Sequence, residues 1–211
     1  MLAGKLNPVA MAIYALAFLL ALTVHEYAHA RAAFSAGDDT AKKAGRLSLN
    51  PLVHLDVAGT ILFVITLIAG FGIAWGKPVP VNHLKMRDPR WDSLKISLWG
   101  PLSNILLAIA LSVALWFVKA SMAGAVIYIC ILFNLTIAFF NLIPIAPLDG
   151  SHILAALLPQ KAAQKYAFIM SKYGLIILAA AIFVPLGGQT LVTRLIRLPI
   201  DALSRLVIQL L

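Results

Sequence analysis

Long runs of uncharged, mostly apolar residues dominate this 211-residue chain and restrict the folds open to it. Apolar residues make up 62% of the sequence and charged residues only 12%, whereas a soluble domain carries about 25% charged residues. A bilayer core has no water to bond the backbone, so such runs form helices there. The sequence therefore predicts an all-α, multi-pass protein of the cell membrane, with the lipid bilayer as its surroundings.

The apolar runs predict where the long helices lie. The expected helices span about residues 8–34, 93–119, 122–141 and 166–184. The third of them should stop before Pro144 and Pro147, because proline lacks the backbone donor that a helix needs. The tail, residues 190–211, places basic side chains at helical spacing opposite leucines and isoleucines, which indicates an amphipathic helix at the membrane interface.

The stretch from residue 37 to residue 92 differs from these helices. Its apolar run, 61–69, is short and is followed by glycines, whereas a full crossing needs about 20 apolar residues. We expect 37–92 to be a re-entrant, partly extended, β-like segment with both ends on one face of the membrane. The chain then divides into a core at 1–158, built on three helices, and C-terminal transmembrane and amphipathic helices at 159–211.

The first helix ends in a motif that carries chemistry, His25-Glu26-Tyr27-Ala28-His29, and Glu26 is the only glutamate in the chain. A helix advances 100° per residue, so His25 and His29 lie on one face, one turn apart. Two neutral imidazoles suit zinc, and the carboxylate between them can take a proton from water. Ionisable groups at the end of an apolar helix are costly to embed, which favours a functional site.

A catalytic zinc needs a third protein ligand. The single cysteine lies in an apolar run, and no second glutamate exists. The remaining candidates are Asp38, Asp39, Asp56, Asp88, Asp92, Asp149, Asp201, His54, His83 and His152. Asp149 is favoured because it follows an apolar helix and two prolines, where irregular backbone is tolerated only if it is buried or lines a wet cavity. We interpret His54 and His152 as groups that support the ligands.

The directions of the helices constrain this site. If Asp149 meets the two histidines, the helices 8–34 and 122–141 run the same way and 93–119 runs against them. The basic residues that then share one face are Lys42, Lys43, Arg46, Lys77, Lys85, Arg87, Arg90 and Lys95. Positive loops are cytoplasmic, so the active site is expected toward the cytoplasm. The net charge of +9 fits anionic lipid and, without an aromatic-interleaved basic stripe, argues against a nucleic-acid partner.

Five motifs occur in an order that resembles the site-2 protease family of intramembrane zinc metalloproteases. They are HEYAH at 25–29, GRLSLNPLVHLDVAGT at 45–60, KPVPVN at 77–82, GPLSN at 100–104 and NLIPIAPLDG at 141–150. The resemblance covers about residues 8–158 and is closest to the compact prokaryotic branch, which lacks CBS and PDZ domains. Val57 departs from it, since relatives commonly have proline there.

The resemblance implies roles for single residues. His25, His29 and Asp149 would bind one Zn²⁺ per chain, and Glu26 would be the catalytic base. Asn141 would hold the substrate backbone. For Asn104 we expect a place in the lining of the cleft, with a bond to a neighbouring helix as the alternative.

The function implied is hydrolysis of peptide bonds in or near transmembrane helices of membrane protein substrates. It would serve regulated intramembrane proteolysis or the clearance of signal-peptide remnants. Two alternatives stay open at this point: a metal transporter, and a catalytically silent protein that binds transmembrane helices. No residue selects a particular substrate or an oligomeric state.

Overall fold

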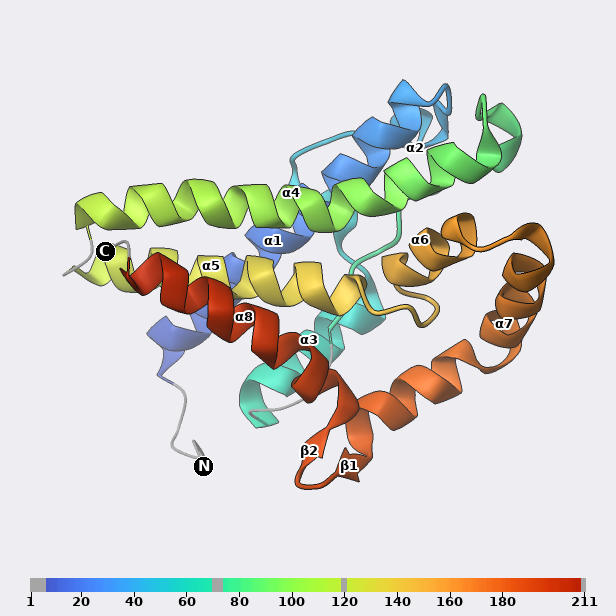
Figure 1. The fold of residues 1–211 in the computed structure, drawn as a ribbon. Helices are drawn as coiled ribbons and strands as arrows, with labels where there is room; N and C mark the ends of the chain where they lie inside the picture. Colours follow the sequence, from blue (N-terminus) through green and yellow to red (C-terminus); the bar gives the residue numbers. More distant parts are fainter. Residues whose placement is uncertain (1–6, 70–73, 119–120, 210–211) are drawn as a thin grey trace.

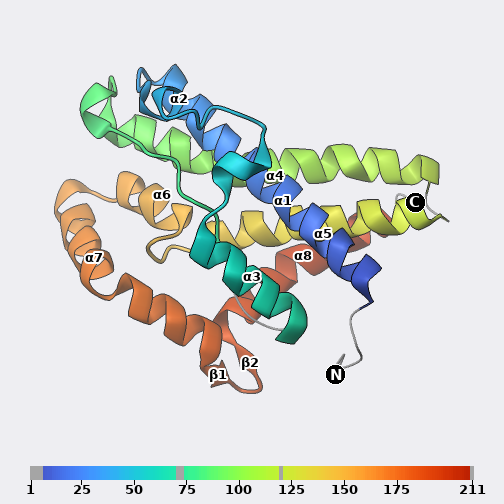
Figure 2. The same ribbon diagram turned by 180° about the vertical axis from the view of Figure 1, so that it is seen from behind.

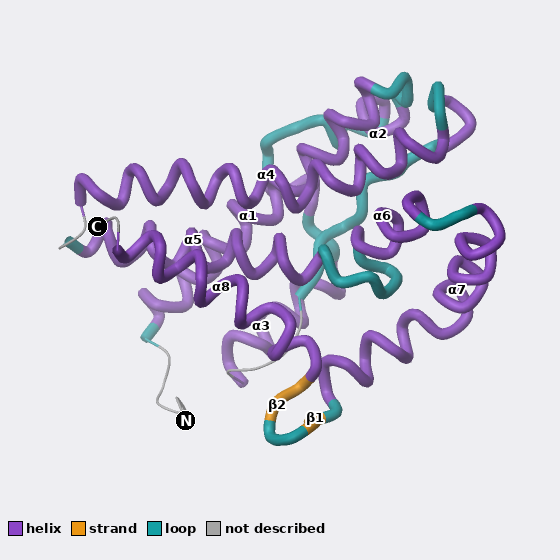
Figure 3. Tube along the Cα trace, viewed as in Figure 1, coloured by secondary structure: helices purple, strands orange, loops and turns teal. Residues whose placement is uncertain are grey.

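The computed structural model describes residues 7–69, 74–118 and 121–209, and it is almost entirely helical (Figures 1 and 3). Among these residues, four helices are long and apolar enough to cross a membrane. They are α1 (Pro8–Ser35), α4 (Pro89–Val118), α5 (Met122–Asn141) and α7 (Gln160–Phe183). The predicted all-α, multi-pass membrane architecture is confirmed.

Helices α1, α4 and α5 pack against one another and form the core that carries the site. Helix α4 runs opposite to α1 and α5, so the C-terminal ends of α1 and α5 point the same way, as Figures 1 and 2 show from two sides. Between α4 and α5 the contact is apolar and includes Leu115, Ile131 and Leu135. Helices α1 and α5 therefore run in the same direction, as predicted from the sequence for 8–34 and 122–141.

The segment 37–92 leaves the core and returns to it. Its elements are α2 (Thr40–Lys43), the 3₁₀ turn η1 (Pro51–His54), α3 (Val57–Ala69) and the 3₁₀ turn η2 (His83–Lys85). Leu55 and Gly76 form an antiparallel bridge, so the chain just before α3 lies beside the chain that returns after it. Helix α3 has 13 residues and is about 20 Å long, too short for a bilayer core of about 30 Å.

The β-like character expected of this segment was wrong for most of its length. Residues 57–69 are helical, and among the described residues of the segment only the bridge at Leu55 and Gly76 is β-like. The physical reason is that an apolar segment facing lipid satisfies its backbone best within itself, which outweighs the weak helix preference of β-branched residues. Phe63 anchors α3 to α1 by stacking on Phe18, with ring centroids 4.3 Å apart.

A buried carboxylate holds the ends of this segment together. Asp38, directly after α1, accepts hydrogen bonds from the backbone N–H of Asn82 at 2.6 Å and of Thr40 at 3.0 Å. Burial acts to raise the pKa of the Asp38 carboxyl, but these N–H donors, together with the nearby Lys85 ammonium, hold that pKa below its usual range.

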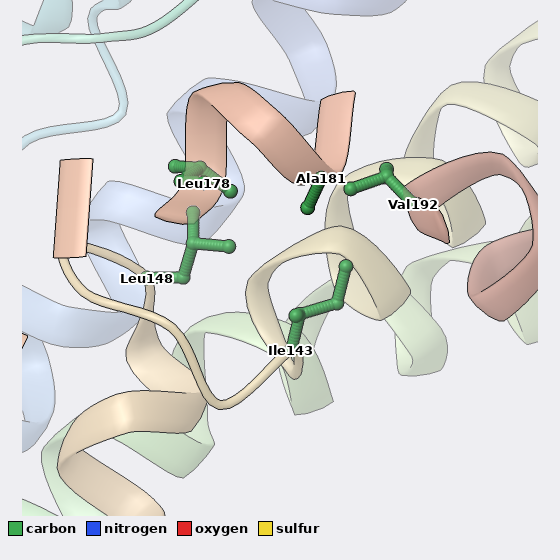
Figure 4. Close-up of a cluster of buried hydrophobic side chains, with 5 residues drawn as sticks. All are labelled: Ile143, Leu148, Leu178, Ala181 and Val192. Atoms are coloured by element: carbon green, nitrogen blue, oxygen red, sulfur yellow. The ribbon is translucent and has the colours of Figure 1, made fainter. Parts of the chain in front are cut away.

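The chain after α5 folds back over the core. Its elements are α6 (Asp149–Leu157), α7, the short strands β1 (Pro185–Leu186) and β2 (Gln189–Thr190), and α8 (Leu191–Gln209). Figure 4 shows how Ile143 and Leu148, in the loop after α5, pack with Leu178 and Ala181 of α7 and Val192 of α8. This cluster fixes the loop that leads into α6. The helical tail expected at 190–211 is present as α8, with residues 210 and 211 outside the described part, and its interfacial position stays a prediction.

Candidate metal centre

Three predicted ligands meet at one end of the core. His25 and His29 project from α1, and Asp149 begins α6. The Nε2 atoms of His25 and His29 are 3.0 Å apart, and they lie 3.1 and 3.3 Å from Asp149 Oδ2. One donor atom from each of the three residues lies within 4.8 Å of the others, a group that could hold one metal ion. Both histidines are buried, and Asp149 is half-buried.

Helix α4 fixes the orientation of both imidazole rings. His25 Nδ1 lies 2.7 Å from Asn104 Oδ1, and His29 Nδ1 lies 2.8 Å from the carbonyl oxygen of Ile96. Both partners accept, so each ring carries its proton on Nδ1 and turns the lone pair of Nε2 toward Asp149. A histidine that binds a metal through Nε2 needs this tautomer.

Asn104 reaches this position through a buried amide network. Its Nδ2 donates to the carbonyl oxygen of Ala21 at 2.9 Å and to Asn134 Oδ1 at 2.8 Å, which leaves only Oδ1 for His25. Asn104 is fully buried and does not line the cavity at the site. The expectation that it lines the substrate cleft was therefore wrong: all its bonding capacity is used inside the protein, and it positions a histidine.

The donor set fits a cation. Asp149 Oδ2 is buried without a hydrogen-bond partner among the described residues, although two Nε2 atoms lie within 3.3 Å. Those nitrogens carry no proton in the tautomer set by α4, so they cannot donate to it. Three electron-pair donors facing one point without a proton between them would repel one another, and a zinc ion bound there removes that cost.

Two glycines, Gly100 and Gly150, lie where the chain packs too closely for a side chain, and this lets the three ligands converge. A Cβ on Gly100 would lie 2.4 Å from His29 Nε2 and 2.8 Å from His25 Cε1. A Cβ on Gly150 would lie 2.3 Å from the carbonyl oxygen of Leu142. Glycine at these positions allows α4 to approach the imidazoles and α6 to start directly beneath the end of α5. The motifs GPLSN and PLDG therefore contribute glycines that permit close helix packing, in addition to their polar side chains.

Glu26 faces the same cavity, which has a volume of about 820 Å³ and is lined by parts of α1, α4, α5, α6 and α7. Its Oε2 accepts a hydrogen bond from the backbone N–H of Val79 at 3.2 Å. The two residues before Val79 are held by the buried Arg46, whose guanidinium donates to the carbonyl oxygens of Lys77 and Pro78. The extended loop 77–82 thus steadies the carboxylate beside the metal ligands.

The other predicted residues have different positions. Asn141 lines the cavity, and its Nδ2 donates to the carbonyl oxygen of Ile137. His152 is exposed and lines the same cavity one turn after Asp149. His54 is buried against other groups: its Nε2 contacts the carbonyl oxygen of Ser48 at 2.8 Å, and it does not line the cavity. The expectation that His54 supports the metal ligands was therefore wrong.

Sequence reasoning missed four contributors: the Ile96 carbonyl, Asn134, Arg46 and the Val79 amide. Asn134 had a usable signal, because an amide inside an apolar helix needs a buried partner. The backbone groups of Ile96 and Val79 have no residue-type signature. Two histidines and an aspartate form a group that could hold a metal ion, a glutamate lies alongside, and helices long and apolar enough to cross a membrane surround them. This donor set is typical of zinc peptidases.

Comparison with known proteins agrees with this class. The model of peptidase family M50 matches residues 116–181. The chain is 40% identical over 183 residues to YwhC of Bacillus subtilis (strain 168), provisionally named as a zinc metalloprotease; the match covers 82% of this chain and 81% of YwhC. No solved structure gives a significant match.

Two further relatives have names of the same kind. Zinc metalloprotease MJ0392 of Methanocaldococcus jannaschii is 33% identical over 44% of this chain and 27% of its own length. Rip2 of Mycolicibacterium smegmatis, also provisionally named as a zinc metalloprotease, is 31% identical over 63% of this chain and 52% of its own. The chain belongs to peptidase family M50, the site-2 protease family, and is a zinc metalloprotease.

Proposed function

We propose that this protein is a zinc-dependent intramembrane endopeptidase that cleaves membrane proteins within or next to their transmembrane helices. The observation that carries the proposal is the position of the ligand cluster. His25, His29 and Asp149 lie among membrane-spanning helices and face a cavity of about 820 Å³. A cavity of this size has room for several residues of an unwound substrate.

His25, His29 and Asp149 hold the zinc in this proposal. When bound, zinc supplies Lewis acidity, which makes water more acidic and a peptide carbonyl more electrophilic. Glu26 accepts a proton from the attacking water and then delivers it to the nitrogen of the leaving amine. The hydrogen bond from Val79 keeps one carboxylate oxygen of Glu26 in place and leaves the other free for this transfer.

The substrate has to become extended before it can react, because a peptide bond within a helix is already hydrogen-bonded and crowded by its neighbours. The extended loop 77–82 contributes Pro78, Val79 and Val81 to the lining of the cavity. Pro78 and Pro80 have no N–H to donate, so a bound strand would pair mainly with carbonyl oxygens. Asn141, at the end of α5, supplies a side-chain amide to the same space.

The site faces the cytoplasm in this proposal. Basic residues cluster at the end of the core where α1 finishes and α4 begins, the end that carries α2 in Figure 1. The positive-inside rule assigns such an end to the cytoplasmic side. Water would then reach Glu26 from the cytoplasm.

A reconstituted cleavage assay tests the proposal. The purified protein is placed in liposomes with a single-span reporter whose transmembrane helix carries either a central Gly-Pro pair or Leu-Leu. Wild type should cleave the Gly-Pro reporter faster, because its helix unwinds more easily, and Glu26→Gln should lose activity by 10²-fold or more while keeping its zinc. Asp201→Asn, in α8, serves as the matched acidic control. Turnover by Glu26→Gln, or cleavage confined to soluble peptides, would contradict the proposal.

A further inference from the structure

A second cavity of about 820 Å³ lies between α1 and α4, on the face of α1 that points away from the metal centre. At 100° per residue, Arg31 is 160° around the helix from His29, so the two side chains leave α1 in nearly opposite directions. None of the metal ligands lines this second cavity, which we call the α1/α4 groove. It is therefore separate from the cavity at the metal centre.

The groove changes character along its length. Its deeper part is lined by apolar groups, among them Val24, Ala28 and Trp99. Its outer part, where α1 ends and α4 begins, carries Arg31, Arg87 and Lys95. Arg31 lies about 9 Å along the helix axis from His25, toward the end of the core. Apolar walls capped by cations match the two halves of an anionic phospholipid, whose acyl chain is apolar and whose phosphate is negative.

The two acidic residues in the groove do not neutralise the arginines. Asp88 Oδ1 accepts from the backbone N–H groups of Arg90 and Trp91, and Asp92 accepts from the N–H of Asp88. Both carboxylates thus cap the start of α4, and Asp92 also pairs with Lys95 at 3.1 Å. Among the described residues, no ion pair is found for Arg31 or Arg87.

We propose that the α1/α4 groove binds an anionic phospholipid, with the phosphate between Arg31 and Arg87 and an acyl chain along Ala28 and Trp99. A guanidinium group can donate two parallel hydrogen bonds to the oxygens of one phosphate. Tryptophan is enriched at the boundary between lipid headgroups and acyl chains. In a bilayer, lipid of some kind would contact this groove. The groove is expected to prefer lipids with a negative headgroup over neutral ones.

A lipid bound in the groove would contact both α1 and α4, the two helices whose packing orients the histidines of the metal centre. Ser103, in the groove, donates its hydroxyl to the carbonyl oxygen of Gly100 at 2.7 Å, and its Oγ lies 3.4 Å from the carbonyl oxygen of Val24 across the α1–α4 contact. The same α4 segment carries the Ile96 carbonyl and Asn104, which orient the histidines. Binding in the groove should therefore stabilise the packing of α1 on α4.

Lipid retention and thermal unfolding test the proposal without relying on proteolysis. The full chain is placed in nanodiscs of phosphatidylcholine alone or with phosphatidylglycerol, and bound lipid is counted by native mass spectrometry after release into detergent. We expect wild type to retain about one phosphatidylglycerol and to unfold at a higher temperature when it is present. The double variant Arg31→Gln/Arg87→Gln should bind it on the order of tenfold more weakly and lose the shift in unfolding temperature.

Two comparisons make the test specific. Lys161→Gln/Lys165→Gln removes the same positive charge from exposed positions on α7 and should behave like wild type, whereas Arg31→Lys/Arg87→Lys should recover part of the binding. An equal loss in the α7 variant would show a bulk charge effect and overturn the proposal. So would equal retention of both lipids, full competition by inorganic phosphate, or capture of a substrate helix instead of lipid by a photo-crosslinker at Trp99.

Discussion

Replacing Gly100 by alanine should damage the metal centre while leaving the fold intact. The new Cβ would lie 2.4 Å from His29 Nε2 and Cε1, whereas ordinary van der Waals contact begins at 3.4 Å, so one partner must move by about 1 Å. The rings cannot turn away without breaking their contacts with Asn104 and Ile96. Displacement of catalytic groups by about 1 Å costs on the order of 10²-fold in rate, which corresponds to about 2.7 kcal/mol in the activation barrier.

The helix itself should tolerate Gly100→Ala, because alanine favours a helix over glycine by about 1 kcal/mol. The expected result is a folded protein with about 10²-fold lower proteolytic activity and weaker zinc binding, measured by reporter cleavage and by competition with a zinc-binding dye. Ser112→Ala, three turns further along α4 and bonded only to Ala108 in its own helix, is the control. Activity and zinc affinity equal to wild type in Gly100→Ala would refute the close packing described for the histidines.

Three further changes test other parts of the site. Asn104→Ala removes the acceptor for the first histidine and should lower zinc affinity by about 10–100-fold, measured by dye competition. Arg46→Gln loosens the loop behind the catalytic carboxylate and should lower kcat by about tenfold at unchanged zinc content; an unchanged kcat would exclude that role. The depressed pKa of Asp38 means that its carboxylate adds stability above about pH 4, which is lost as pH falls through the folded-state pKa. The difference in unfolding temperature between wild type and Asp38→Asn should accordingly shrink in acid, and a difference independent of pH would count against that carboxylate.

The parts of the fold that could be predicted are those set by local sequence. Apolar runs give the long helices, and α5 ends where expected because prolines follow it. The spacing of His25 and His29 places them on one face of α1. Asp149 could be favoured as the third ligand because it follows an apolar helix and two prolines, where irregular backbone has to be buried or line a wet cavity.

The errors concern contacts between distant parts of the chain. His25 and Asn104 are 79 residues apart, and nothing in the local sequence says whether the amide faces the cleft or the imidazole. His54 lies in a promising motif, yet it turns toward Ser48. The segment 37–92 was expected to be partly extended because its apolar run is short and followed by glycines, but residues 57–69 form a helix, which satisfies their backbone groups within the segment. The orientations of Asn104 and His54 depend on tertiary contacts, and the conformation of 57–69 depends on whether water or lipid surrounds it.

The most direct test of the central claim is the zinc content of the purified, detergent-solubilised protein, determined by elemental analysis. Wild type and Glu26→Gln should contain close to one zinc per chain, and Asp149→Ala should contain much less. Asp56→Ala is the matched control, because Asp56 accepts from Gly59 and Trp75 and from neither histidine, so its loss should not affect zinc. Full zinc in Asp149→Ala, or none in well-folded wild type, would contradict a zinc ion held by His25, His29 and Asp149.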